Sequence, residues 1–129
     1  MYVLNSTLRT LQVVLGGTIT TSQLDVVTHY DERGYDETDE GIAADVNTTN
    51  NTTAVTIVGA PSHSGRVRVV KSLSVFNKDT ASATVTVRYN DNGTTFVLIK
   101  VTLPTMYQLY YEDQAGWSVI MPSGARLAT

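Results

Sequence analysis

The chain has 129 residues, a net charge of −3 and no cysteine. This length corresponds to a single domain with its own core, and the missing cysteines exclude disulfides, thiolate nucleophiles and cysteine metal ligands. The negative charge argues against binding nucleic acid. Threonine, valine and isoleucine together provide 42 residues, whereas glutamate and lysine provide seven. Because β-branched side chains favour strands and the scarce residues favour helices, the composition predicts an all-β fold.

Residues 1–17 mix apolar and polar side chains and end in a Gly-Gly pair. Their leucines recur at helical spacing, but the valine pair and the threonines suit a strand, so we predict an extended N-terminal arm or a first strand. No basic region precedes an apolar stretch, and no apolar run reaches the roughly 20 residues of a membrane helix. We therefore expect neither a signal peptide nor a membrane partner. The residues of this segment predicted to contact a neighbouring subunit are Leu4, Leu8, Leu11 and Val13.

The main domain is predicted to span residues 18–120, and it begins with a strand over 23–30. Leu24, Val26 and Thr28 share one parity in this strand, as expected when one face is buried. The following stretch, 31–51, places six carboxylates within its first ten positions and then continues as an Asn/Thr tract. Without periodicity this stretch is predicted to be a long acidic loop.

Carboxylates at this density make the stretch a candidate calcium-binding site, because hard cations need several oxygen ligands. The spacing does not match an EF-hand, where glycine occupies the sixth loop position. A calcium site of another type and a solvated, self-repelling loop are the two alternatives. The candidate calcium ligands are Asp31, Asp36, Asp39 and Glu40.

A meander over 66–103 is the strongest pattern in the chain. Asn92-Gly93 separates two alternating runs, and this pair tolerates the positive φ of a tight hairpin turn. The polar cluster 77–82 predicts the preceding turn. Period-two repetition predicts one buried face in each run. The residues assigned to these faces are Val67, Val69, Leu73 and Val75, then Val85, Val87 and Tyr89, then Val97, Ile99, Val101 and Leu103.

Short strands are also predicted over 52–58, 106–112 and 116–120, and residues 121–129 are predicted to be an irregular, exposed tail. Seven or eight short strands about ten residues apart are typical of an antiparallel β-sandwich or jelly roll. Aromatic residues gather near the end of the chain. We expect them to contribute to core and interface packing, while a sugar- or nucleic-acid-binding face is the alternative. The tyrosines assigned to an interface are Tyr107, Tyr110 and Tyr111.

Catalytic motifs are absent from the sequence. His29 precedes Asp31 and Glu32, so a base–carboxylate pair is the catalytic alternative at that point. The chain has no Gly-x-Ser-x-Gly elbow, His-Glu-x-x-His motif or phosphate-binding glycine loop. We expect an ordinary strand-end histidine, a protein that is not an enzyme, and no cofactor.

Charge is unevenly distributed along the chain. Residues 1–65 carry two basic and eight acidic side chains, whereas 66–129 carry seven basic and four acidic ones. Such an imbalance favours head-to-tail contact between subunits or docking on a charged neighbour, and an acidic loop beside an ordinary remainder is the alternative.

Three stretches resemble small virion proteins of tailed bacteriophages. These are NSTLRTLQVVLGG at 5–17, NNTTAVTIVGAP at 50–61, and the meander that ends in YNDNGTTFVLIKVTL. The family also has a closing aromatic-Gly-Trp strand similar to residues 110–119. The similarity covers nearly the whole chain except 31–45, and its motifs are structural.

This resemblance implies a virion component assembled in the host cytoplasm. Among virion proteins, a short β-sandwich with an apolar terminal arm and uneven charge is similar to capsid decoration (cement) proteins, which bind the assembled shell, commonly as trimers. The expected partners are the major capsid protein and further copies of this chain. The alternative is a tail, neck or head-fibre module that binds host glycan through the acidic loop and the tyrosines.

Overall fold

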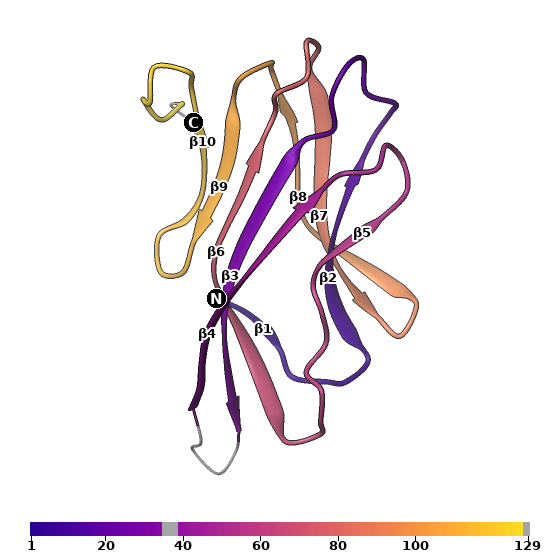
Figure 1. The fold of residues 1–129 in the computed structure, drawn as a ribbon, viewed down its shortest axis with the longest axis vertical. Coiled ribbons are helices and arrows are strands. Elements are labelled where there is room, and N and C mark those ends of the chain that lie inside the picture. The colour runs from indigo at the N-terminus through magenta and orange to yellow at the C-terminus, as the bar shows by residue number, and fades with distance from the viewer. Residues whose placement is uncertain (35–38, 128–129) are drawn as a thin grey trace.

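The computed structural model describes residues 1–34 and 39–127, with only the backbone described at 39 and 40. The described residues form antiparallel strands and no helix (Figure 1). The predicted all-β sandwich is confirmed, with ten strands in the described part where seven or eight were expected. The strands are β1 (Tyr2–Leu4), β2 (Arg9–Leu15), β3 (Asp25–Gly34), β4 (Asp39–Thr48), β5 (Val55–Val58), β6 (Arg66–Phe76), β7 (Ala83–Asp91), β8 (Thr94–Leu103), β9 (Gln108–Glu112) and β10 (Gly116–Ile120).

Two sheets form the sandwich. Sheet A has the order β10-β9-β6-β3-β4, and sheet B has the order β5-β2-β7-β8. The short strand β1 pairs with residues 68–70 of β6, and β9 pairs with residues 72–76 of the same strand. Because β3 occupies the other edge of β6, β1 and β9 follow one another along a single edge.

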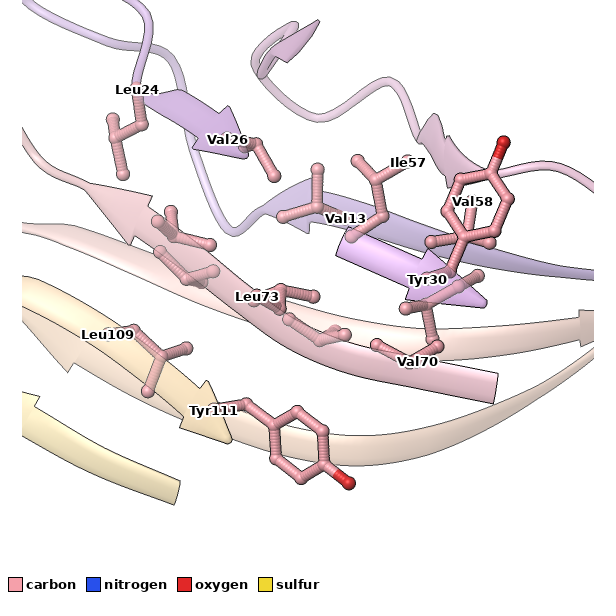
Figure 2. Packing of buried hydrophobic residues seen from close by; sticks show 14 of the residues in the cluster. Val13, Leu24, Val26, Tyr30, Ile57, Val58, Val70, Leu73, Leu109 and Tyr111 are labelled. Carbon is pink, nitrogen blue, oxygen red and sulfur yellow. The ribbon is translucent and has the colours of Figure 1, made fainter. Parts of the chain in front are cut away.

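The core lies between the sheets. Apolar side chains from β2, β3, β5, β6, β7 and β9 meet there, and Figure 2 shows several of them pointing toward one another. Burying such side chains is the main favourable contribution to folding. The largest fully buried side chains are Leu4, Leu11, Leu24, Ile57, Leu73, Leu103 and Leu109, with several valines.

The predicted N-terminal arm is corrected by this arrangement, because residues 2–4 and 9–15 are strands of the sandwich itself. Strand β2 lies inside sheet B, between β5 and β7. Leu4, Leu11 and Val13 are fully buried in the core of this chain. The segment therefore matches the other prediction, a strand of the domain, and it forms two strands, β1 and β2.

The predicted acidic loop is also corrected. Residues 31–34 complete β3 and residues 39–48 form β4, so most of the stretch is a β-hairpin. Exposure alternates along β4, where Ile42, Ala44 and Val46 are exposed and their neighbours are half-buried. The charges at the start of the stretch hid this period-two pattern.

A β-bulge changes the predicted face of β6. His29 pairs with Ser72 and Tyr30 pairs with Val70, so Lys71 is an extra residue in β6. One extra residue reverses the side-chain alternation. The predicted core positions Val67 and Val69 therefore share no face with Leu73 and Val75. Instead, Arg68 and Val70 point inward in the first half of the strand, and Val70 is fully buried.

A second bulge does the same in β8. Val87 pairs with Ile99 and Arg88 pairs with Val97, which leaves Leu98 as the extra residue. Val97 was predicted to face the core, but it lies opposite Arg88 on the outer face and is exposed. The predicted two-residue hairpin turn before this strand is confirmed, since Asn92 and Gly93 have φ values of 52° and 93°.

Polar side chains organise the end of the sandwich where the 77–82 turn lies. Asn77 is fully buried, and its amide donates hydrogen bonds to the Ala81 and Leu103 carbonyl oxygens at 3.0 and 2.9 Å. The carboxylate of Asp79 accepts hydrogen bonds from the amides of Thr20 and Thr21 at 2.8 and 2.6 Å. These bonds fix two loops that the hydrophobic core does not reach.

The Asp79 carboxylate is stabilised in its charged form. The hydrogen bond from the Thr20 amide is the main cause of a pKa well below the usual value of 3.8, and the Thr21 and Ser22 amides add to it. Hydrogen bonds to a carboxylate favour ionisation. A lowered folded-state pKa means that this contribution to stability is complete above about pH 3.8 and is lost as the pH falls further.

The segment 121–127 is exposed and has no regular strand, as predicted for the tail. It turns back on β10, because the Leu127 amide donates a hydrogen bond to the Val119 carbonyl at 2.7 Å. The tail therefore covers part of the β10 edge.

Leu11→Ala is expected to cost about 3 kcal/mol of unfolding free energy, because it leaves a cavity between the sheets. Leu8→Ala, at an exposed leucine in the same segment, should change it by less than about 0.5 kcal/mol. Urea unfolding followed by far-UV circular dichroism measures both. Equal costs for the two variants would contradict the placement of residues 1–17 as core strands.

Asp79→Asn is expected to lower stability at neutral pH, because an amide nitrogen cannot accept the bond from a backbone amide. The wild type should also lose stability between about pH 4 and pH 2 more steeply than this variant. Chemical unfolding across that range measures the difference. Asp25→Asn, which removes only a surface ion pair with Lys78, is the matched control and should keep the wild-type slope.

Candidate functional site

The predicted interface residues separate into buried and accessible groups. Leu4, Leu11 and Val13 are fully enclosed in the core, and Tyr111 is buried, so these four cannot contact a partner in the folded chain. Their assignment to an interface is corrected for that reason. The accessible residues are Leu8, which is 56% exposed, and the half-buried Tyr107 and Tyr110.

Tyr111 belongs to an aromatic cluster centred on Tyr2. The Tyr2 ring lies 4.8 Å from that of Tyr111 and 5.9 Å from that of Trp117, and the Trp117 Nε1–H donates a hydrogen bond to the Tyr2 hydroxyl at 2.7 Å. Tyr89 of sheet B lies edge-on to Tyr2 at 6.2 Å. Burial raises the pKa of both Tyr89 and Tyr111. The cluster joins the two sheets, and the sequence did not reveal the central role of Tyr2.

The calcium candidates are only partly described. Asp31 is buried in β3, and its Oδ2 accepts a hydrogen bond from the Arg33 Nε at 2.7 Å. Asp36 lies outside the described residues, and Asp39 and Glu40 belong to β4 with no side-chain description. No group of three or more potential ligands gathers among the side chains that the structure describes. The calcium assignment stays a prediction.

The histidine considered as a catalytic base lies on the outer face of sheet A. The His29 Nδ1 is 3.0 Å from the Ser72 Oγ, and both residues are at paired positions of β3 and β6. Neither residue lines any of the three hollows described below. The pair can share a proton, but its side of the sheet is open to water.

The charge imbalance along the sequence is partly cancelled by ion pairs between the two halves of the chain. Arg68 of β6 pairs with Glu32 of β3 through an Nε–Oε1 distance of 3.1 Å, and each side chain is only 17% exposed. The Arg68 Nη1 also donates a hydrogen bond to the Gly59 carbonyl at 3.0 Å, and its guanidinium lies 4.7 Å from the centre of the Tyr30 ring. Lys78 pairs with Asp25 at 2.9 Å. Two cations of the second half therefore already hold anions of the first half.

Arg88 of β7 forms no ion pair in the described part of the chain and donates a hydrogen bond to the Gln12 Oε1 at 3.3 Å. Two further cations of the second half also lack an ion pair there, Lys100 of β8 and Arg126 of the tail. Both are exposed. The positions lie on the same side of the molecule, because Lys100 borders a groove that also contains Leu127. Excess positive charge is therefore located at this groove.

The groove runs between the edge strands β8 and β10 and has a volume of about 220 Å³. Its lining is mainly apolar, with one side formed by inward-facing residues of β8 and the other by β10. Through this groove, solvent or a partner reaches the edge of the hydrophobic core, where Leu109 lies. The lining residues are Ile99, Lys100, Val101, Leu109, Trp117, Ser118, Val119 and Leu127.

A larger hollow of about 570 Å³ lies beside the Gly16-Gly17 turn and includes Asp79, Thr84 and Lys100. It is more polar than the groove. Its carboxylate is already occupied by backbone amides, as described above. A third hollow, of about 320 Å³, lies between Phe76 and the tail.

Two ten-residue strands leave their outer edges unpaired within the described residues, β4 in sheet A and β8 in sheet B. On β4, Val46 is 78% exposed and Ile42 is 73% exposed; on β8, Val97 is 62% exposed and Phe96 is 53% exposed. Long apolar edges are sites where further strands add. Alternation within 41–48 could have identified β4 from the sequence, but its position at an edge could not be read there.

No family model, curated protein or solved structure matches this chain. None of the described residues forms a helix that is long and apolar enough to cross a membrane.

Arg68→Leu is expected to cost about 2–3 kcal/mol, because Glu32 would remain largely buried without its partner. The double variant Arg68→Leu/Glu32→Leu should recover most of that loss, since no uncompensated charge is left. Urea unfolding of both single variants and the double variant completes the cycle. Additive losses would show that the two charges are not energetically coupled.

Proposed function

We propose that this chain is a structural protein of tailed-bacteriophage virions and acts as a capsid decoration (cement) protein. It binds the assembled shell, where the major capsid protein is its partner, and stabilises the contacts between capsomers. The sequence resemblance over 5–17, 50–61 and the meander supports the virion assignment. The fold supports a binding role through the apolar surface that it leaves uncovered.

The exposed side chain of Leu8 is the observation that supports a contact with the shell. It is the predicted interface leucine that remains exposed, and it lies in the turn between β1 and β2. Its carbonyl oxygen accepts a hydrogen bond from the Asn92 amide at 2.9 Å, so this turn and the β7–β8 turn form one end of the sandwich. Arg9, which pairs with Asp91 at 3.2 Å, holds the same two turns together. An apolar side chain on a rigid end is suited to a shallow pocket on a shell.

Repetition would make such a small contact effective. One leucine buries too little area for a stable complex between two monomers. A shell presents the same contact at many symmetric positions, and a trimeric decoration protein engages several of them together. The stabilisation of the shell is then the sum over all copies.

A reconstruction of the virion that carries this chain tests the assignment. We expect regular copies on the outer surface of the shell at local three-fold positions, with the Leu8 end toward the capsid protein. A few copies at the portal, neck or tail, or no copies at all, would contradict it. The first of these outcomes, together with glycan binding by the isolated protein, would favour the fibre or connector alternative.

Leu8→Lys tests the contact itself, using shells that lack the protein. The substitution should reduce bound copies at a given concentration at least about tenfold, because a lysine must lose its hydration to enter an apolar pocket. Met106→Lys is the matched control, since Met106 is similarly exposed and follows β8 at the opposite end. Binding is measured by co-sedimentation with shells. Equal losses for both variants would overturn the assignment to Leu8.

A further inference from the structure

The unpaired edges of β4 and β8 differ in charge. Strand β4 contains Asp39, Glu40 and Asp45 and no basic residue, whereas β8 contains Lys100 and no acidic residue. Arg126, which forms no ion pair in the described part of the chain, pairs with Ile120 at the end of β10, and its neighbour Leu127 lines the groove between β10 and β8. One edge of the molecule is therefore acidic and the other is basic.

The apolar surfaces beside the two edges also correspond. Strand β4 presents the exposed row Ile42, Ala44 and Val46 on one face. Strand β8 borders the apolar groove, whose lining includes Val119 and Leu127. A strand added to the β8 edge places alternate side chains over this groove. The β4 row supplies side chains of that kind at that spacing.

We infer that β8 of one copy pairs with β4 of a second copy, so that the sandwich associates head to tail with itself. The backbone groups of both edges are then hydrogen-bonded, and Ile42, Ala44 and Val46 cover the β8–β10 groove. This interface is heterologous, because two different edges meet. Such contacts close into a ring or continue as a filament.

The other self-pairings fit less well. Joining β4 to β4 brings acidic strands together, which is unfavourable for like charges across a sheet. Joining β8 to β8 leaves the apolar row of β4 in water. Pairing β4 with β8 covers both edges in one contact and places opposite charges near each other. The inference rests on these edges and does not depend on the virion assignment.

Two edge variants of the full chain test the pairing. Val46→Lys disables β4 and leaves β8 intact, whereas Val97→Lys disables β8 and leaves β4 intact. Lysine on an exposed edge strand is tolerated within one chain but blocks addition of another strand. Both sites are largely exposed, so we expect wild-type circular dichroism and thermal unfolding for each variant. Leu8→Lys is the control substitution away from both edges.

Sedimentation velocity over a range of concentrations measures the association. We expect the wild type and Leu8→Lys to form oligomers, and each edge variant alone to associate at least about tenfold more weakly. Mixing the two edge variants should restore a complex that stops at a dimer, because one intact β8 and one intact β4 remain.

Three outcomes would overturn the inference. A wild type that stays monomeric at all concentrations leaves no self-pairing to explain. A Val46→Lys variant that still associates fully, with no new complex on mixing, would show a symmetric β8–β8 contact or another surface. Association that is lost only in Leu8→Lys would move the self-contact to the end of the sandwich. Since these experiments use purified protein alone, they are independent of binding to shells.

Discussion

Strand β6 organises the sandwich through backbone pairing along both of its edges. Its eleven residues hold β3 along one edge, while β1 and then β9 occupy the other. The bulge at Lys71 lets the two halves of the strand contribute different side chains to the interior. Arg68 and Val70 face inward beside β1, and Leu73 and Val75 face inward beside β9. Without the extra residue, one half would turn its polar face to the core.

Strand β1 completes the sandwich at this point. It has only three residues, yet Leu4 is fully buried and Tyr2 contacts aromatic rings from β7, β9 and β10. The Tyr89 hydroxyl accepts a hydrogen bond from the Val3 amide at 3.0 Å, which ties β1 to the opposite sheet. The N-terminal segment thus links the sheets within one chain, and this explains why an apolar terminus here does not imply an arm that reaches a neighbour.

Exposed apolar side chains remain where the sandwich has edges. An open sheet must end in strands whose outer backbone groups have no partner, and proteins often cover such strands or place charges on them. Here the tail hydrogen-bonds to part of β10, while β4 and β8 expose Val46 and Val97. The largely buried ion pair between Glu32 and Arg68 withdraws one charge of each half from the surface, and Lys100 and Arg126 are left beside the groove. The exposed apolar side chains of β4 and β8, and the two cations beside the groove, therefore lie at the edges of the sheets.

Local sequence patterns are sufficient to predict the fold class and the most regular hairpin. β-branched composition, short alternating runs and the Asn92-Gly93 turn depend on local backbone preferences, and these act over a few residues. The alternation of Leu24, Val26 and Thr28 predicted a buried face for the same reason, and the structure confirms it.

Pairing between distant strands sets the features that local backbone preferences do not encode. A bulge depends on the partner strand, so the reversals at Lys71 and Leu98 were invisible in a single run of residues. Whether an apolar strand is central, as β2 is, or at an edge, as β4 and β8 are, depends on which strands pair with it. Burial of Leu11 and exposure of Leu8 follow from that pairing, because similar leucines acquire different surroundings only when distant segments come together.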